Sequence, residues 1–220
     1  MVAKKSLLLI SFFIVLSVGC ATAPPVRDAL KEDLKVPAGK IEGNQFTGIR
    51  YPFNVNVSVL SHWKMTLEFP DFLEELGYDR PSPMDKEQTE LYVYHPETKS
   101  SIQFDLTPAG RYATFNQAKI EWLTTAATDS LKSEIEKDYG KDTTVEVGPT
   151  EPISLKGVQF AARKYAIYKV KGLKREQGWI YGFTEPYQIF ILYMILEREG
   201  TSDREDLKKI LDSFEVISKK

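Results

Sequence analysis

Residues 189–196 read Ile-Phe-Ile-Leu-Tyr-Met-Ile-Leu, an unbroken run of apolar and aromatic side chains. A strand with one face in water alternates apolar and polar residues, and this run does not alternate. Because successive side chains of a β-strand point to opposite faces, a strand formed here is apolar on both of them. Such a strand is covered from both sides. The run therefore predicts a three-layer domain with helices on each face of a central sheet.

Alternating patterns before this run predict the other strands of the sheet. Residues 178–184 form a hairpin with 188–196 around Glu185-Pro186-Tyr187, and 158–170 gives a long strand. Further strands are expected at 54–60, 64–69, 91–95, 102–106 and 143–147. The expected fold class is α+β: a three-layer α/β/α sandwich with a central, mostly antiparallel sheet.

The clearest helix signal lies between Thr114 and Gly140. Thr114 and Gln117 form a capping box, and Gly140 is a typical residue just past a helix end. Apolar residues recur between them at three- to five-residue steps, which predicts one helix over 115–139, about 36 Å long. The expected buried stripe, with Trp122 in the core, consists of Phe115, Ala118, Trp122, Ala126, Leu131, Ile135 and Tyr139.

Two more helices are expected. Pro70 opens a short helix over 72–76 that Gly77 ends, and Ser202 with Glu205 forms a second capping box near the C-terminus. The last helix buries Leu207, Ile210, Leu211 and Phe214.

The N-terminus has the layout of a secretory signal peptide, with Lys4 and Lys5 before an apolar run from Ser6 to Val18. That run is shorter than the ~20 residues of a membrane-spanning helix. It ends at Cys20, the only cysteine, and the stretch resembles the lipobox of bacterial lipoproteins. It departs from that pattern at Ser17, where leucine is usual.

The lipobox resemblance implies that residues 1–19 are removed and that Cys20 carries fatty acyl chains as the new N-terminus. Residues 20–45, rich in proline, glycine and charge, are then a flexible linker. Residues 46–220 are expected to form one domain. Ala21 follows the cysteine where aspartate signals inner-membrane retention, so we expect a lipid-anchored envelope protein, on the outer membrane facing the periplasm in a diderm organism.

Charge and cysteine content exclude other classes. Lysine and arginine number 29 against 31 aspartate and glutamate, a formal net charge of −2, so no basic excess exists for nucleic acid. With its single cysteine committed to the anchor, the domain has no disulfide. Because there is no basic excess to bind a membrane surface, membrane attachment must come from lipid.

Few residues carry the patterns of catalysis or metal binding. The two histidines, His62 and His95, lack metal-site spacing, and no nucleophile elbow, P-loop or dinucleotide fingerprint is present. We expect no enzyme activity, no cofactor and no metal. A hydrolase using the carboxylates within 68–79 is the least favoured alternative, because acids on a short amphipathic helix normally form its solvated face. These acids are Glu68, Asp71, Glu74, Glu75 and Asp79.

Candidate contacts for a partner or ligand come from aromatic and basic residues. A strand-end tryptophan can seal the core or line a groove, and tyrosines suit a peptide, glycan or protein partner. The segment 169–177 could hold an anionic headgroup or an acidic partner, or simply keep a hairpin tip soluble. The candidate residues are Trp63, Trp179, Tyr187, Lys171, Lys174 and Arg175.

The order of strands, helix, strands and C-terminal helix resembles the PsbP-like fold, and especially the DcrB-like lipoproteins of bacterial envelopes. The residues that carry this resemblance are Phe53-Asn54-Val55-Asn56-Val57 leading to Trp63, and Ile210-Leu211-Asp212-Ser213-Phe214. It covers residues 46–217 and departs at Ser61-His62, where a proline–glycine turn is common. The resemblance implies an α/β/α sandwich without shared catalytic residues, whose known members assist other envelope or thylakoid proteins.

The expected function is therefore that of a membrane-anchored envelope lipoprotein, a non-enzymatic module that binds or supports another envelope protein. The alternative is a carrier or sensor of a small apolar ligand, held in a pocket near Trp122 between the long helix and the sheet.

Overall fold

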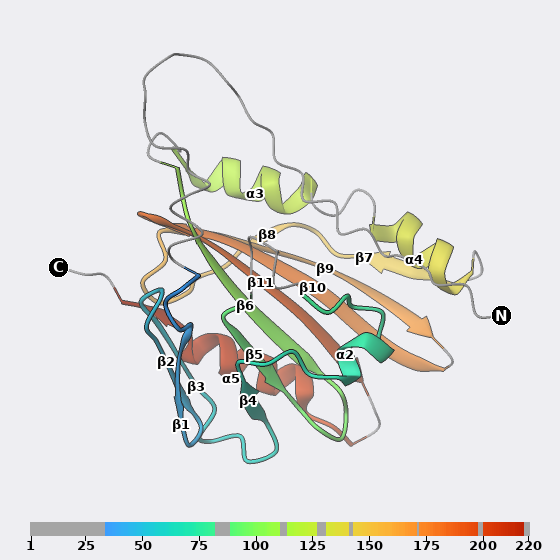
Figure 1. Ribbon diagram of the computed structural model, residues 1–220. Coiled ribbons are helices and arrows are strands. Elements are labelled where there is room, and N and C mark those ends of the chain that lie inside the picture. The colour runs from blue at the N-terminus through green and yellow to red at the C-terminus, as the bar shows by residue number, and fades with distance from the viewer. Residues whose placement is uncertain are drawn as a thin grey trace.

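The computed structural model describes residues 34–81, 89–110, 114–126, 131–140, 143–170, 172–197 and 200–217. Their strands form a four-stranded sheet, ordered β1-β2-β3-β12, and an eight-stranded sheet, ordered β4-β5-β6-β11-β10-β9-β7 with β8 paired to β9 (Figure 1). The small sheet comprises β1 (Gly39–Glu42), β2 (Gln45–Gly48), β3 (Phe53–Asn56) and β12 (Glu215–Val216). The large sheet comprises β4 (Lys64–Thr66), β5 (Leu91–Tyr94), β6 (Ser101–Pro108), β7 (Val145–Val147), β8 (Glu151–Pro152), β9 (Phe160–Val170), β10 (Leu173–Thr184) and β11 (Tyr187–Glu197). The helices are α2 (Phe72–Glu75), α3 (Gln117–Ala126), α4 (Leu131–Tyr139) and α5 (Asp203–Ser213).

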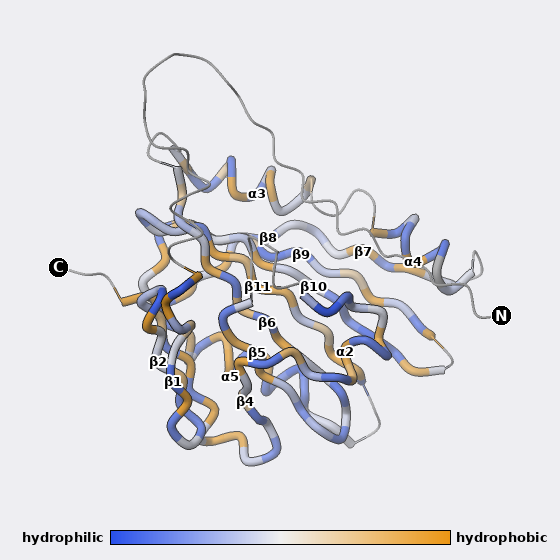
Figure 2. Tube along the Cα trace, in the orientation of Figure 1, coloured by the Kyte–Doolittle hydropathy of each residue, from blue (hydrophilic) through white to orange (hydrophobic). Residues whose placement is uncertain are grey.

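Strand β11 lies at the centre of the large sheet, where it pairs antiparallel with β10 and β6. Its odd-numbered residues from Ile189 to Ile195 are at most 1% exposed and belong to the main core. On the opposite face Phe190 and Leu192 pack against a second apolar cluster. The expectation of a strand covered on both faces is confirmed, and Figure 2 shows hydrophobic stretches running along the central strands.

Two separate layers cover this sheet, as Figure 1 shows. Helices α3 and α4 lie over one face, with Ile120 of α3 and Ile135 of α4 buried in their own clusters against β9 and β10. Helix α5 and the small sheet cover the other face, and their apolar side chains join the main core. All strand pairs of the large sheet are antiparallel. The α+β three-layer sandwich expected from the sequence is what the structure shows.

The placement of Trp122 in the core was wrong, whereas the continuity of the helix expected over 115–139 depends on residues 127–130, which lie outside the described residues. The structure has two helices, α3 and α4, separated by residues outside the described ranges. Trp122 is 58% exposed, whereas Ile120 and Thr124 are buried. The buried face is set by the sheet beneath: the indole Nε1 of Trp179 donates to the Thr124 carbonyl at 3.1 Å, which turns the 120/124 edge of α3 inward.

The ordered fold begins before Phe46, contrary to the expected linker boundary. Strand β1 lies within the stretch 20–45 and pairs with β2 through Ile41 opposite Phe46, which is fully buried. The basic segment 169–177 was expected to be a binding segment or a soluble hairpin tip. Lys169 lies in β9 and residues 173–177 begin β10, so most of its described residues belong to the sheet. Cys20 and Lys171 lie outside the described residues.

A buried polar network ties α5 to the sheet. Tyr193 of β11 donates its hydroxyl to Glu176 of β10 at 3.0 Å, and Arg204 of α5 pairs with the same carboxylate at 2.6 Å. The Glu176 side chain is only 5% exposed. Gly178 lies opposite Tyr193 across the β10–β11 pair, and a Cβ there would stand 2.2 Å from the Tyr193 hydroxyl. The Tyr193 ring therefore occupies space that a side chain at position 178 would fill.

We predict that Gly178→Ala destabilises the protein by about 1–3 kcal/mol, because the added methyl group overlaps the Tyr193 ring in a packed core. Gly110→Ala is the matched control, since a Cβ at 110 meets nothing within 4 Å. Urea denaturation of both variants measures the difference. Equal stability of the two would contradict the described packing of Tyr193.

A second prediction concerns the three tryptophans. Trp63 and Trp179 are 1% and 4% exposed, against 58% for Trp122. Trp122→Phe should therefore remove most of the tryptophan fluorescence that acrylamide quenches, while leaving the folding stability nearly unchanged. If the variant retains the full quenchable fraction, the exposed position of Trp122 is incorrect.

Candidate functional site

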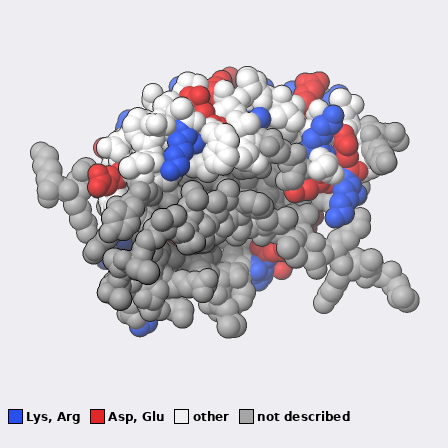
Figure 3. All heavy atoms as spheres, turned by 90° about the horizontal axis from the view of Figure 1, so that it is seen from above, with Lys and Arg blue, Asp and Glu red and all other residues white. Residues whose placement is uncertain are grey.

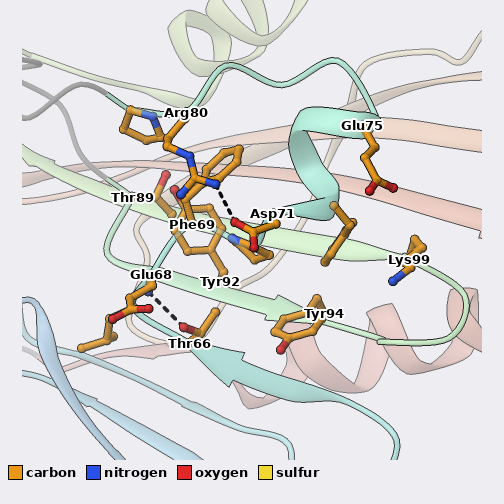
Figure 4. A pocket seen from close by; sticks show the side chains of 14 residues that line it. Thr66, Glu68, Phe69, Asp71, Glu75, Arg80, Thr89, Tyr92, Tyr94 and Lys99 are labelled. Carbon is orange, nitrogen blue, oxygen red and sulfur yellow. Dashed lines mark hydrogen bonds and ion pairs between the residues drawn. The ribbon is translucent and has the colours of Figure 1, made fainter.

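A hollow with a volume of about 910 Å³ lies beside α2. We call it the α2 groove. It is formed by the segment from β4 to α2, the residues after α2, strand β5 and the turn that follows β5 (Figure 4). Strand β4 is the edge strand of the large sheet, so the groove lies at a border of the molecule's central layer.

Local sequence explains how the chain turns over the end of β4 to form this groove. The Thr66 hydroxyl accepts a hydrogen bond from the Glu68 amide at 3.0 Å, which closes a turn after β4. Pro70 then begins the single turn of α2, whose Leu73 is fully buried. Gly77, with φ of +96°, ends it in a conformation that side chains disfavour.

Four aromatic rings line the groove in two pairs. Phe69 meets Tyr92 edge-on with ring centroids 5.9 Å apart, and Phe72 lies 5.5 Å from Tyr94. Phe69 and Phe72 come from the α2 segment, whereas Tyr92 and Tyr94 project from the same face of β5. Burial raises the pKa of Tyr92, so its hydroxyl stays protonated and can donate.

The groove is charged as well as aromatic. The Arg80 guanidinium lies 5.1 Å above the Phe69 ring and pairs with Asp71 at 2.6 Å and Glu74 at 3.3 Å. The hydrogen bonds that the guanidinium donates to Glu74 and Asp71 raise the pKa of Arg80. The Lys99 ammonium lies 5.2 Å from the Phe72 ring. Phe69 and Phe72 thus each make a cation–π contact with a basic side chain of this protein.

Two acidic residues of the groove, Glu68 and Glu75, have no ion-pair partner within the described part of the chain. Both are exposed, so they present negative charge to solvent at the groove. The acids of 68–79 were expected to form a solvated helix face. Glu74 and Glu75 are exposed as expected, but Glu68, Asp71 and Glu75 also line the groove, which the sequence pattern did not reveal.

The candidate contacts named from the sequence lie apart from this groove. Trp63 is buried and donates its indole N–H to Asp206 at 3.1 Å, and Trp179 is buried beneath α3. Tyr187 is half-buried, edge-on to Tyr51 at 5.7 Å. Lys174 pairs with Glu197 at 2.8 Å, which lowers the pKa of that carboxylate. As contacts for a partner, these residues stay predictions.

Arg175 has a distinct environment near the C-terminal end of α4. Its guanidinium lies 5.5 Å from the Tyr139 ring and donates to the Tyr139 hydroxyl at 3.3 Å. Tyr139 in turn stacks on Tyr168, and burial raises the pKa of Tyr168 to about 12. The structure therefore places Arg175 away from Lys174's ion pair, and no common site joins the five candidate residues that the structure describes.

The two histidines are close in space although they are far apart in the sequence. Their rings lie 5.8 Å apart, and the buried ring of His95 also meets Trp63 edge-on. The Nδ1 atom of His95 accepts hydrogen bonds from the amides of Glu97 and Thr98, each 3.3 Å long. Among the described residues no group of three or more His, Cys, Asp or Glu side chains is arranged to hold a metal ion.

The surface around these features is mixed in charge. Figure 3 shows acidic and basic side chains interspersed on the described part of the face seen from above. Within the residues described, no helix combines the length and apolarity needed to cross a membrane.

The fold and groove define a single-chain α+β sandwich with an aromatic, acidic groove at one sheet edge. No protein-family model matches the chain, and a search of curated proteins found no match. Several solved structures are similar to it, and three of them are the following. The solution structure of cyanobacterial PsbP (CyanoP) from Synechocystis sp. PCC 6803 matches 82% of this chain and 99% of its own length, at 10% identity and a TM-score of 0.48.

The second, a crystal structure from Bacteroides thetaiotaomicron VPI-5482, matches over 81% of this chain and 50% of its own length, at 10% identity and a TM-score of 0.46. The third is the crystal structure of LpqN, involved in cell envelope biogenesis of Mycobacterium tuberculosis. It matches over 78% of this chain and 87% of its own length, at 12% identity and a TM-score of 0.47. We transfer no site or activity from any of the three.

Proposed function

We propose that this protein is a non-enzymatic binding module of the cell envelope that holds a basic, extended segment of a partner protein in the α2 groove. The observation that carries the proposal is the combination, in one hollow of about 910 Å³, of paired aromatic rings with the carboxylates of Glu68 and Glu75, which have no ion-pair partner among the described residues. Apolar rings with a few charged groups are the usual composition of a recognition site.

The charges favour a cationic occupant. Arg80 is already held by Asp71 and Glu74, so the negative charge available to a ligand is that of Glu68 and Glu75. The positions of Arg80 over Phe69 and Lys99 over Phe72 indicate that aromatic rings here accept a cation at about 5 Å. A partner's lysine or arginine can use the half-buried Tyr94 in the same way.

The place of the groove in the sheet favours an extended occupant. Strand β4 pairs only with β5 among the described strands, so its other edge has backbone groups available for pairing. A peptide that adds to such an edge gains main-chain hydrogen bonds, while neighbouring pockets select its side chains. The α2 groove lies directly beside β4 and supplies such pockets.

The alternatives have less support. Two apolar clusters that include Trp179 and Phe183 lie between α3, α4 and the sheet, and the α2 groove lies elsewhere. A hydrolase needs converging carboxylates. In Figure 4, Asp71 turns to Arg80 while Glu68 and Glu75 point in different directions, so we propose that the protein is not an enzyme.

The location that fits this role is the envelope, with the domain attached through acylated Cys20 after removal of residues 1–19. This part of the proposal rests on the charged, apolar and small-residue order of the leader and on the position of the single cysteine. Several acyl chains on one cysteine give stable attachment, whereas a single chain holds weakly. We place the domain in the periplasm, at the outer membrane in a diderm organism.

The groove is tested with a fluorescent peptide that alternates lysine and valine, and with its counterpart that carries glutamate for lysine. The full chain should bind the first and not the second, with an affinity that falls as salt is raised. The double variant Glu68→Gln/Glu75→Gln should weaken binding by about fivefold, because two exposed charges are removed. Fluorescence anisotropy measures the affinity.

The matched control is Glu42→Gln/Glu146→Gln, which removes the same charge from β1 and β7, away from the groove. It should leave the affinity unchanged. Binding that is equal for both double variants would overturn the proposal. Binding of an oligosaccharide that does not depend on salt, in place of the basic peptide, would assign the groove to a glycan instead.

The anchor is tested by Cys20→Ser in the native host. The variant should move from the membrane fraction to the soluble fraction, because the sulfur that carries the acyl chains is absent. Thr22→Ser is the control and should stay with the membrane. Mass spectrometry of the purified native N-terminus should find acylated Cys20, and a methionine start or an unmodified sulfur there would contradict the anchor.

A further inference from the structure

A second hollow, of about 430 Å³, lies on the opposite face of the large sheet between α5 and strand β9. We call it the α5 pocket. Its volume is within the range of small-molecule sites. None of the candidate residues named from the sequence lines it, and it shares no residue with the α2 groove.

One side of the α5 pocket is aliphatic. Its walls come from the segment after β8, from β9 and from α5, and they consist of Ile153, Leu155, Ile167, Leu207 and Leu211. Leu155, Leu207 and Leu211 are buried members of the main core, so the aliphatic wall is anchored in rigid packing. Packing a chain of methylene groups against this wall would remove apolar surface from water, which favours binding.

The polar side of the pocket contains one network whose charges are already balanced. The buried Glu176 carboxylate accepts the Tyr193 hydroxyl and pairs with Arg204, as described above, and Arg204 also reaches Glu197 at 3.1 Å. Lys208 pairs with Asp212 at 2.8 Å. These four charged groups at the pocket therefore have partners within the chain.

Arg163 differs from them. Its Nη2 atom pairs with Glu151 at 3.2 Å, and its guanidinium stacks over the Tyr165 ring at 4.8 Å. Its Nε–H is buried and has no acceptor among the described residues. A Cβ at Gly148 would come within 2.8 Å of the Tyr165 ring, so the glycine lets that ring lie where it supports Arg163. A held arginine with an unused buried donor is costly unless an acceptor is supplied.

We propose that the α5 pocket binds an aliphatic monocarboxylate, with its chain on the wall of Ile167, Leu207 and Leu211 and its carboxylate on Arg163. The two oxygens of a carboxylate match the Nε–H and a terminal N–H of a guanidinium. The ligand would share Arg163 with Glu151, whose side chain is 45% exposed and can turn to solvent. The site is independent of the α2 groove.

The test uses the full chain carrying Cys20→Ser as common background, so that no attached acyl chain competes, with decanoate as the probe below its micelle concentration. Isothermal titration calorimetry should detect decanoate binding, with decan-1-ol weaker by about tenfold because it lacks the second oxygen. Arg163→Met should reduce the affinity for decanoate to that for decan-1-ol. Lys164→Met, the next residue of β9 on the other face of the sheet, should leave it unchanged.

Glu151→Gln gives a prediction of opposite sign. It removes the carboxylate that competes for Arg163, so decanoate should bind more tightly, by about threefold. A merely structural role of Arg163 would not produce this gain. Circular dichroism shows whether Arg163→Met folds. If it does not, Glu151→Gln still tests the proposal, because Glu151 is half-exposed and its replacement should not disturb the fold.

Three results would overturn the proposal. They are no binding of decanoate, equal binding of decanoate and decyltrimethylammonium, or an affinity for decanoate that neither Arg163→Met nor Glu151→Gln changes. Each of them means that the pocket does not recognise a carboxylate through Arg163.

Discussion

Burial of β11 on both faces is the constraint from which the rest of the architecture follows. A single large aliphatic side chain gains about 1.5–3 kcal/mol when it leaves water, and β11 buries such side chains alternately on two sides. Neither face can be left open. One is closed by α5 and the small sheet, the other by α3, α4 and the segment of α2, and β10 and β6 flank the strand along its length. The α2 groove and the α5 pocket both lie at places where this covering ends.

Polar groups fix how α5 covers its face. Apolar packing alone would tolerate a shift of the helix, whereas buried hydrogen bonds are directional and costly to leave unmade. Arg204 reaches Glu176 across the layer, the Trp63 indole donates to Asp206, and the Ser100 hydroxyl bonds Asp203 at 2.5 Å. These three attachments hold α5 at a set distance from β9, and the α5 pocket is the space that the helix leaves there.

Elements with strong local patterns could be predicted from the sequence. The strands β5, β6, β9 and β11 and the helix α5 stand close to where their periodicity placed them. The burial of Trp122 was mispredicted because the α3 sequence offers two possible inner faces: Trp122 lies on one, and Ile120 and Thr124 lie on the other. Only the position of Trp179 on the sheet decides between them. The short strands β1 and β2 carry few apolar residues and are held by pairing and by Phe46.

The functional surfaces were less predictable, for a physical reason. Tyr92 and Tyr94 alternate with Leu91 and Val93, and such a pattern reads as ordinary strand packing. What makes a groove of them is the turn of α2, which stands against the same face and comes from an earlier segment. The His62–His95 contact and the environment of Arg163 likewise join residues whose proximity arises only from sheet register and helix docking.

The separation of the two hollows has a consequence for how the protein can work. The α2 groove lies at the β4–β5 edge on the face of Tyr92, and the α5 pocket lies near β9 on the face of α5. Between them stands a sheet whose interior side chains are packed on both faces, and such interiors do not deform continuously.

Ligands at the two sites share no residue and should bind additively unless one of them moves a layer as a unit. The element able to do so is α5, because Arg204 and Leu207 line the pocket while Phe214, at its end, packs on Phe53 and Phe104. Among the described elements, α5 therefore offers a physical connection from the α5 pocket to the main core beneath β5 and β6.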